Sequence, residues 1–242
     1  MKKFLKKIIK TLLTPFVLKD YFSFLKVDKE KRFTIKLKDF YPQIKDKTIG
    51  TNFDRHYVYH TSWAARVISE IKPEKHIDIS SSLYFSGIVS AFVPVDFYDL
   101  RPADLILSNL ESKSGNLMSL PFESGSIKSL SCMHTIEHIG LGRYGDPINP
   151  DGDIDACKEL SRVLEKDGSL LFVTPISDEP RIEWNAHRIY SYDQVLKLFP
   201  ELRLKEFSLI PEDSKDGGLI RNADINLLLG EKYACGCFHF IK

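Results

Sequence analysis

The sequence predicts an α/β domain with a mostly parallel sheet, preceded by a basic helical segment. Two observations predict this class. The stretch DACKELSRVLEKDGSLLFVTPI (155–176) contains a helix with apolar side chains at helical spacing, a turn at Asp167 and Gly168, and a continuously apolar strand. Helical and strand-like runs alternate before it, as in parallel sheets that helices cover. With 242 residues, 43% of them hydrophobic and 28% charged, the chain can bury the core of such a domain.

The first 26 residues differ from the rest. Lysines alternate with apolar residues in a pattern that gives one helix a basic face and an apolar face: Lys2, Lys3, Lys6, Lys7 and Lys10 among Phe4, Leu5, Ile8, Ile9, Leu12 and Leu13. We expect Pro15 to limit this helix. No uncharged run reaches the roughly 18 to 20 residues of a membrane span. Three partners stay open for this helix: an anionic cytoplasmic membrane surface, the chain's own domain, or a partner subunit.

The remaining elements follow in order. Residues 27–50 form a lysine-rich linker or edge hairpin, so we divide the chain into 1–50 and 51–242. The expected helices cover 57–71 (ended by Pro73), 83–92, 155–164 and 191–199. The expected strands cover 76–80, 92–100, 126–133, 169–173, 202–210 and 233–241, with residues 105–110 as a third strand or the approach to one.

Charge and cysteine content narrow the function classes. The chain has 34 basic and 33 acidic side chains, which gives no overall field to attract nucleic acid. The four cysteines have neither the spacing of a secreted disulfide framework nor a C-x-x-C pair, which favours a reducing cytoplasm. Cys235 and Cys237 lie in the alternating run YACGCFHF, where we interpret them as buried strand residues.

Four stretches carry a resemblance to a known family. They are HIDIS (76–80), VDFYDLRP (95–102), NLMSLPFESGSIKSLSCMHTIEHI (116–139), and the helix, turn and strand from Asp155 to Pro175. Over roughly Tyr57 to the C-terminus the chain resembles the class I S-adenosylmethionine-dependent methyltransferases. The resemblance implies a Rossmann-like methyltransferase fold with a mostly parallel seven-stranded sheet. Within these methyltransferases, the chain is similar in particular to an uncharacterised bacterial family associated with surface-polysaccharide genes.

The resemblance implies S-adenosylmethionine as cofactor and assigns residues to it. Asp78 corresponds to the acidic residue that closes the first strand, and Asp99, with Asp96 as competitor, to the carboxylate on the ribose hydroxyls. Asn116 and Leu117 correspond to the adenine contacts. In an open parallel sheet such residues gather outside the carboxyl ends of the strands. The implied reaction transfers a methyl group to an oxygen or nitrogen of a small-molecule or glycan-like acceptor.

The loop after the first strand departs from the family pattern. Glycines let the backbone pass close to the ligand there, whereas this chain has Ser80, Ser81 and Ser82, followed by bulky Tyr84. Serine is small and can donate a hydrogen bond to the cofactor's carboxylate, so we assign Ser80 and Ser82 to cofactor binding. The alternative is an inactive relative that serves as a scaffold or a membrane-associated partner.

His134, Glu137 and His138 form an H-x-x-E-H string. As a zinc motif this string needs a helix of several turns, but a strand-like pattern precedes it and glycines follow it at once. We therefore predict no metal here, with a zinc hydrolase as the remaining alternative, and place His134 and Glu137 at a strand tip facing the cofactor.

Catalytic and acceptor-binding residues are expected nearby. Imidazole titrates near physiological pH, so His138 and His187 are the candidate general bases, while His134 is more suited to orienting backbone. The Gly- and Pro-rich loop between Gly140 and Asp155 is long enough to cover an acceptor, and its Arg143 and Tyr144 are the candidate contacts.

Overall fold

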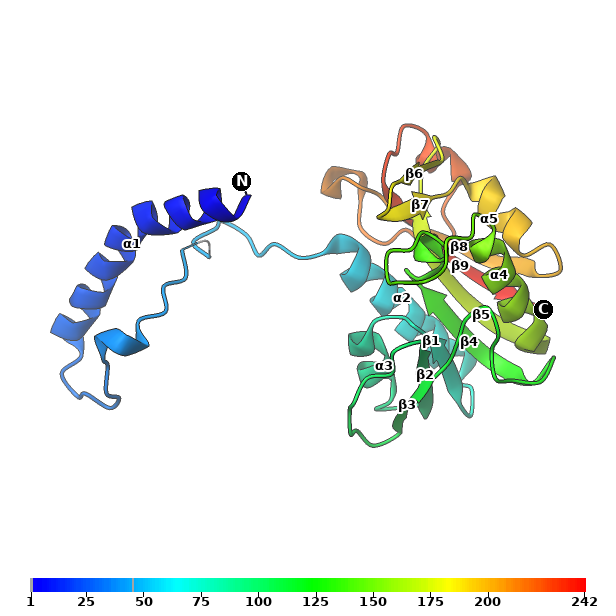
Figure 1. Cartoon of the computed structure of the whole chain (residues 1–242), viewed down its shortest axis with the longest axis horizontal. Coiled ribbons are helices and arrows are strands. Elements are labelled where there is room, and N and C mark those ends of the chain that lie inside the picture. The colour runs from blue at the N-terminus through cyan, green and yellow to red at the C-terminus, as the bar shows by residue number, and fades with distance from the viewer. Residues whose placement is uncertain (1, 45) are drawn as a thin grey trace. The chain divides into compact units, whose positions relative to one another are not determined.

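The computed structural model describes residues 2–44 and 46–242, with side chains from Pro15 onward. The chain forms two compact units, Met1–Phe53 and Asp54–Lys242. In the first, α1 spans Lys2–Val27 and a 3-10 turn, η1, spans Leu37–Asp39, with no strand in its described residues (Figure 1). The side chains of residues 2–14, which include the predicted basic face, lie outside the described residues. Within the described part of the chain, no helix has the length and apolar character to cross a membrane.

We expected Pro15 to limit the first helix, but α1 continues for twelve residues beyond it. A proline inside a helix removes only one backbone hydrogen bond. The turns on either side keep theirs, so the helical pattern of the following residues extends α1 to Val27.

The second unit is built on a seven-stranded sheet with the order β3-β2-β1-β4-β5-β9-β8 (Figure 1). Its strands are β1 (His76–Ile79), β2 (Val95–Asp99), β3 (Leu110–Ser114), β4 (Ile127–Met133), β5 (Leu164–Ile176), β8 (Arg203–Ile210) and β9 (Ala234–Ile241). The pairs among β1 to β5 are parallel, and β9 runs antiparallel to both of its neighbours. The predicted mostly parallel, seven-stranded, Rossmann-like fold is confirmed.

Helices cover the sheet through two separate apolar clusters. The longer helices are α2 (Arg55–Ile71), α3 (Leu83–Val89), α4 (Gly152–Val163) and α5 (Tyr192–Leu198). Along β5, Leu170 and Phe172 pack in the cluster that contains α4 and α5 residues, whereas Leu171 and Val173 pack in the cluster of α2 and α3. Because side chains alternate across a strand, these clusters lie on opposite faces of the sheet. Burial on both faces explains why β5 has a continuous apolar run over residues 170–173.

Local signals fix the ends of the helices. The Asp54 side chain accepts a hydrogen bond from the Tyr57 amide at the start of α2, and Lys72 ends that helix in the left-handed conformation just before Pro73. Ser191 and Gln194 form a capping box at the start of α5. These signals place both helices close to their expected ranges.

The structure refines the expectation at two strands. β3 begins only at Leu110, so residues 105–109 are the approach to the strand, which is one of the two expected alternatives. β5 starts directly after α4, and the expected turn at Gly168 is an irregularity within the strand. A Cβ atom at Gly168 would lie 2.8 Å from the Glu165 carbonyl oxygen, so the bend requires glycine.

A two-stranded ribbon, β6 (Arg181–Glu183) and β7 (His187–Ile189), was not expected. The short helical turns are η2 (Ile136–His138), η3 (Ser214–Asp216) and η4 (Ile225–Leu228).

Candidate functional site

The strand order reverses between β1 and β4. The chain moves from β1 outward to β2 and β3, then returns to place β4 on the other side of β1. At such a switch point the loops at the carboxyl ends of the two strands diverge and leave a crevice, which is where open α/β sheets bind ligands. The residues that follow β1, β2, β3 and β4 therefore form the candidate site.

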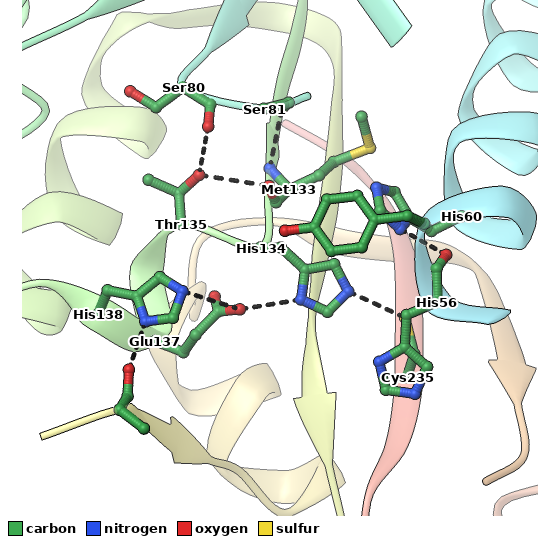
Figure 2. Close-up of polar contacts among 12 residues, drawn as sticks. His56, His60, Ser80, Ser81, Met133, His134, Thr135, Glu137, His138 and Cys235 are labelled. Carbon is green, nitrogen blue, oxygen red and sulfur yellow. Dashed lines mark hydrogen bonds and ion pairs between the residues drawn. The ribbon is translucent and has the colours of Figure 1, made fainter. Parts of the chain in front are cut away.

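The serine loop after β1 is tied to both neighbouring strands. Ser80 has a left-handed backbone (φ 55°), at the position where the resemblance expects glycine. Its amide donates to the Tyr98 carbonyl on β2 at 2.8 Å. On the β4 side, the Thr135 hydroxyl donates to the Ser80 carbonyl at 2.9 Å (Figure 2). The loop thus takes the shape of a glycine loop without the glycine.

The other residues of the loop differ in their contacts and exposure. The Ser81 hydroxyl accepts a hydrogen bond from the Met133 amide at 3.1 Å (Figure 2). Ser82 stands at the N-cap of α3, but its side chain makes no capping hydrogen bond there. Tyr84, the bulky residue of the loop, is 86% exposed and does not fill the site.

Asp78 lies beneath the site rather than in it. The side chain is fully buried, and its carboxylate accepts hydrogen bonds from Ser131 on β4 at 2.6 Å and from Ser86 on α3 at 2.5 Å. Burial raises the pKa of this carboxyl to about 6, against the opposing effect of the serine hydroxyls. Asp78 therefore braces the strand and helix that carry the loop, and the structure does not present it to a ligand as expected.

The structure separates the two carboxylates of β2. Asp99 ends the strand at the crevice, partly exposed, and accepts a hydrogen bond from the Arg101 amide at 2.8 Å. Asp96 lies near the start of the strand, is 6% exposed, and pairs with Lys75 at 2.7 Å and Lys113 at 2.8 Å. Asp96 is thus held in ion pairs at the opposite end of the strand, and Asp99 is the β2 carboxylate that lies at the candidate site.

The loop after β3 lies beside Asp99. The Gly115 amide donates to the Asp99 carbonyl at 3.0 Å, which brings the next residue, Asn116, to the same edge. Asn116 is exposed, and its side-chain oxygen accepts from the Met118 amide at 3.0 Å. Leu117 is 6% exposed and packs in the core. Of the two expected adenine contacts, Asn116 is the one whose side chain is exposed.

His134, Glu137 and His138 lie together at the tip of β4, where His134 is hydrogen-bonded to Glu137 (Figure 2). His134 Nδ1 lies 2.9 Å from Glu137 Oε1, and His138 Nε2 lies 3.9 Å from the same oxygen. Burial opposes the charge on Glu137, but the hydrogen bond from His134 outweighs it and lowers the pKa of this carboxyl. The helical part is the three-residue turn η2, so the local H-x-x-E-H string lacks the helix that a zinc motif needs.

Arg143 and Tyr144 lie next to His138. Arg143 Nη1 donates to the Ala186 carbonyl at 2.9 Å, and His138 Nδ1 lies 2.7 Å from the same oxygen. The Tyr144 ring lies 5.7 Å from the His138 ring and 5.1 Å from the Arg143 guanidinium carbon. The structure therefore joins the loop 140–155 to the histidine end of the site.

Several residues of this end were not predicted. Around the His134 ring lie His56 at 5.6 Å, Tyr57 at 5.4 Å and His60 at 4.8 Å between ring centroids, and His134 Nε2 lies 3.5 Å from Cys235 Sγ. His187, which was predicted as a candidate general base, approaches His138 at 6.2 Å between centroids. The only sequence signal was the four-residue spacing of His56 and His60, which places both on one side of a helix. Nothing in the sequence pattern connected them to Cys235.

Burial controls the charge of these imidazoles. It lowers the pKa of His56 to about 4, and it lowers the pKa of His138 despite the nearby Glu137 carboxylate. Burial also opposes a charged His134, but Cys235 and Glu137 outweigh it and raise the pKa of His134 above its usual range. At neutral pH, therefore, His56 and His138 are neutral.

Comparisons with known proteins place the fold. A family model described as a Caenorhabditis protein of unknown function (DUF268) matches residues 123–203, less than half of the chain. No functionally curated protein matches the sequence. The BH2331 protein of Bacillus halodurans, described as a candidate methyltransferase, is structurally similar with a TM-score of 0.54 at 14% identity, over 75% of this chain and 98% of its own.

Two further solved structures share the fold. One is the 1,6-didemethyltoxoflavin-N1-methyltransferase of Burkholderia thailandensis with bound 1,6-didemethyltoxoflavin and S-adenosylhomocysteine, with a TM-score of 0.54 at 10% identity over 76% of this chain and 78% of its own. The other is the cyclase SpnF, with 0.51 at 10% identity over 75% and 80%. The chain has the Rossmann-like fold of these enzymes. Because the fold carries both a methyltransferase and a cyclase, the reaction has to be argued from the site.

Proposed function

We propose that this protein is an S-adenosylmethionine-dependent methyltransferase that acts on an oxygen or nitrogen of a small-molecule or glycan-like acceptor. One observation carries the proposal: in a sheet with this strand order, the serine loop, Asp99 and Asn116 occupy the switch point together. The exposed tip of β2 and the loop after β3 are joined there by the hydrogen bond from Gly115 to Asp99.

The polar groups at this edge fit the cofactor's chemistry. The partly exposed Asp99 carboxylate can accept hydrogen bonds from two ribose hydroxyls, and the Asn116 amide can pair with adenine nitrogens. The Ser82 hydroxyl makes no capping hydrogen bond to α3 and can donate a hydrogen bond to the methionine carboxylate. When bound, S-adenosylmethionine would supply a methyl group already activated by its sulfonium, which leaves the protein mainly to position the two reactants.

His138 is the proposed general base. An acceptor hydroxyl has to lose a proton as the new bond forms, and a neutral imidazole can take it. Burial lowers the pKa of His138, so the ring is neutral at pH 7. With Nδ1 donating to the Ala186 carbonyl, the lone pair lies on Nε2. His187, whose ring is 6.2 Å away, is the second candidate.

The glycan-like acceptor is the finer part of the proposal. It rests on the sequence resemblance to a family associated with surface-polysaccharide genes, and on aromatic rings near the histidines. Tyr144, which touches His138, is 47% exposed, and Trp184, two residues from Ala186, is 71% exposed. Exposed aromatic faces offer the flat apolar surface on which a sugar ring can lie.

Thermal unfolding with S-adenosylhomocysteine tests the cofactor site without an acceptor. At a ligand concentration about one hundred times the dissociation constant, binding adds roughly 2.7 kcal/mol to the free energy of unfolding. For a domain of this size we expect a rise in Tm of about 5 to 10 °C. Asp99→Ala should abolish this rise.

Asp96→Ala is the matched control, because it removes a carboxylate from the same strand at the opposite end of the sheet. We expect it to lower the Tm of the free protein but to keep the ligand-induced rise. No rise in the wild type at millimolar ligand would contradict the proposal and favour the inactive scaffold. Equal losses in both variants would remove Asp99 from the ribose site.

A further inference from the structure

We propose that His56, His134 and Cys235 bind one zinc ion. The three residues come from separate parts of the fold: the first turn of α2, the tip of β4, and the second residue of β9. One potential ligand atom from each lies within 4.8 Å of the corresponding atoms of the other two. Figure 2 shows the His56 and His134 rings and Cys235 grouped beside the His134–Glu137 contact. The site thus differs from the H-x-x-E-H string, of which it uses only His134.

The distances suit a tetrahedral metal. Zinc bonds to sulfur at about 2.3 Å and to imidazole nitrogen at about 2.0 to 2.1 Å, so a nitrogen and a sulfur bound to the same ion lie about 3.6 Å apart. His134 Nε2 and Cys235 Sγ are 3.5 Å apart without any metal. Because no separation in the group exceeds 4.8 Å, His56 has to move inward by at most about 1.5 Å to reach the same ion.

His134 is oriented as a metal ligand. Its Nδ1 faces Glu137 Oε1 at 2.9 Å, which leaves Nε2 directed at the thiol. A carboxylate on the far nitrogen is the usual support of a zinc-bound histidine, because it fixes the ring and makes the metal-facing nitrogen a better donor. Glu137 is 1% exposed, and its second oxygen has no hydrogen-bond partner. Burying a carboxylate with so few hydrogen bonds is costly, and supporting a metal-bound histidine would account for that cost.

The ligand set selects the metal class. Two imidazoles and a thiolate favour zinc over magnesium or calcium, which prefer oxygen ligands. Three protein ligands also leave a fourth position for water or another ligand, as in catalytic zinc sites. His56 is only partly buried and Tyr57, beside His134, is 44% exposed, so this position can be reached from solvent.

The zinc site adjoins the acceptor end of the proposed methyltransferase site. Through Glu137 it is connected to His138, whose Nε2 lies 3.9 Å from the shared carboxylate oxygen. An acceptor hydroxyl bound at the fourth position would lose its proton to His138 more readily, since zinc lowers the pKa of a bound hydroxyl. This role rests on the proposed function, whereas metal binding does not.

Metal analysis of the full-length protein tests the inference. The chain is purified from zinc-supplemented medium, dialysed against metal-free buffer, and its zinc, copper and iron are measured by mass spectrometry. We expect about one zinc per chain in the wild type. Cys235→Ser and His56→Ala should both lose it. Cys157→Ser is the matched control, because Cys157 is an equally buried cysteine in the apolar cluster on the other face of the sheet.

Two further measurements keep the result interpretable. Cobalt added to the metal-free wild type should produce the intense near-ultraviolet absorption of a thiolate bond, which Cys235→Ser should lack. Glu137→Gln, which keeps the shape of the side chain, should weaken zinc binding by about 10- to 100-fold. His56→Ala alters a partly exposed residue, so it covers the case in which the buried Cys235→Ser variant fails to fold.

The outcomes separate this inference from the proposed function. Absence of zinc from the wild type, copper or iron in its place, or equal zinc in wild type and both ligand variants would each overturn the zinc site. The S-adenosylhomocysteine shift is measured on zinc-loaded and chelator-treated protein in parallel. If the protein binds no zinc but its Tm still rises with S-adenosylhomocysteine, only the zinc site is refuted. If it binds zinc but its Tm does not rise with S-adenosylhomocysteine, only the cofactor site is refuted.

Discussion

The Ser131 hydroxyl donates to the Asp78 carboxylate at 2.6 Å, between the two strands that flank the switch point. Ser86 adds a second hydrogen bond from α3. These contacts only partly replace hydration, so the pKa of Asp78 rises from 3.8 to about 6. The residue that the sequence assigned to the ligand is therefore a buried carboxyl that holds the site's scaffold.

This raised pKa predicts a pH dependence of stability. Between about pH 4 and pH 6 the folded state holds a proton on Asp78 that the unfolded chain has released, so this group's contribution to stability falls as pH rises through that window. The shift corresponds to about 3 kcal/mol. Asp78→Asn removes the titration, so the wild-type minus variant difference in unfolding free energy should fall between pH 4 and pH 6. Urea unfolding at several pH values measures it, and a difference independent of pH would contradict it.

Ser80 predicts a backbone effect that two substitutions can isolate. Its φ of 55° lies where a Cβ atom is unfavourable and glycine is not. Both Ser80→Ala and Ser80→Gly lose the hydroxyl contact to the Tyr98 carbonyl at 3.2 Å, but only glycine relieves the backbone. We expect Ser80→Gly to be more stable than Ser80→Ala by about 1 kcal/mol in urea unfolding. Equal stability of the two variants would show that the loop can relax.

The element pattern was predictable where one segment holds its own signal. β5 was predicted because burial on two faces gives it the continuous apolar run 170–173, and α4 was predicted from its apolar residues at helical spacing. β3 itself was not recognised because LESKS has a single buried apolar residue, Leu110, and pairs as an edge strand with β2, so the sequence indicated only the approach to it. The β6 strand is exposed at all three positions, which left no period to detect.

The same distinction applies to the site. Ser80, Asp99 and Asn116 were expected at one edge of the sheet because Asp99 ends a strand and the other two come shortly after one, and the strand order brings those strand ends together. His56 and Cys235 lie 179 positions apart in the numbering, and they meet only because α2 packs beside β9. Convergence of that kind depends on tertiary packing, for which the local sequence carries no signal.

Arg221 predicts a strong effect on stability far from the site. Its guanidinium bonds Glu206 Oε2 and Glu70 Oε1, both at 2.6 Å, and Glu206 also accepts from the buried Trp63 indole. Arg221→Met leaves the Glu206 carboxylate, 9% exposed, without its cation. We expect a loss of about 1 to 3 kcal/mol in urea unfolding at pH 7. The exposed Arg203→Met is the control and should change stability little.

A pH series and a double variant test the cause of that loss. Burial works against the Glu206 charge, but hydrogen bonds from Arg221, Ser208 and Trp63 lower its pKa to about 2. The stabilisation is therefore complete above the ordinary pKa of about 4.5 and is lost as pH falls toward 2. Adding Glu206→Gln to Arg221→Met should recover part of the loss at pH 7. No recovery would mean that Arg221 acts through packing alone.

The two compact units predict that residues 54–242 fold without the rest of the chain. A protein truncated before Asp54 should unfold cooperatively and keep the Tm rise with S-adenosylhomocysteine, because every residue assigned to the cofactor lies in 54–242.

We also propose that the lysines of residues 2–10 attach the protein to anionic membranes, since each basic residue near such a surface contributes about 1 kcal/mol. Co-sedimentation with phosphatidylserine vesicles should then be strong for the full chain and absent for the truncated one. Replacing the five lysines by glutamine should reduce it while leaving the apolar residues in place, and undiminished binding of either altered protein would refute the membrane proposal.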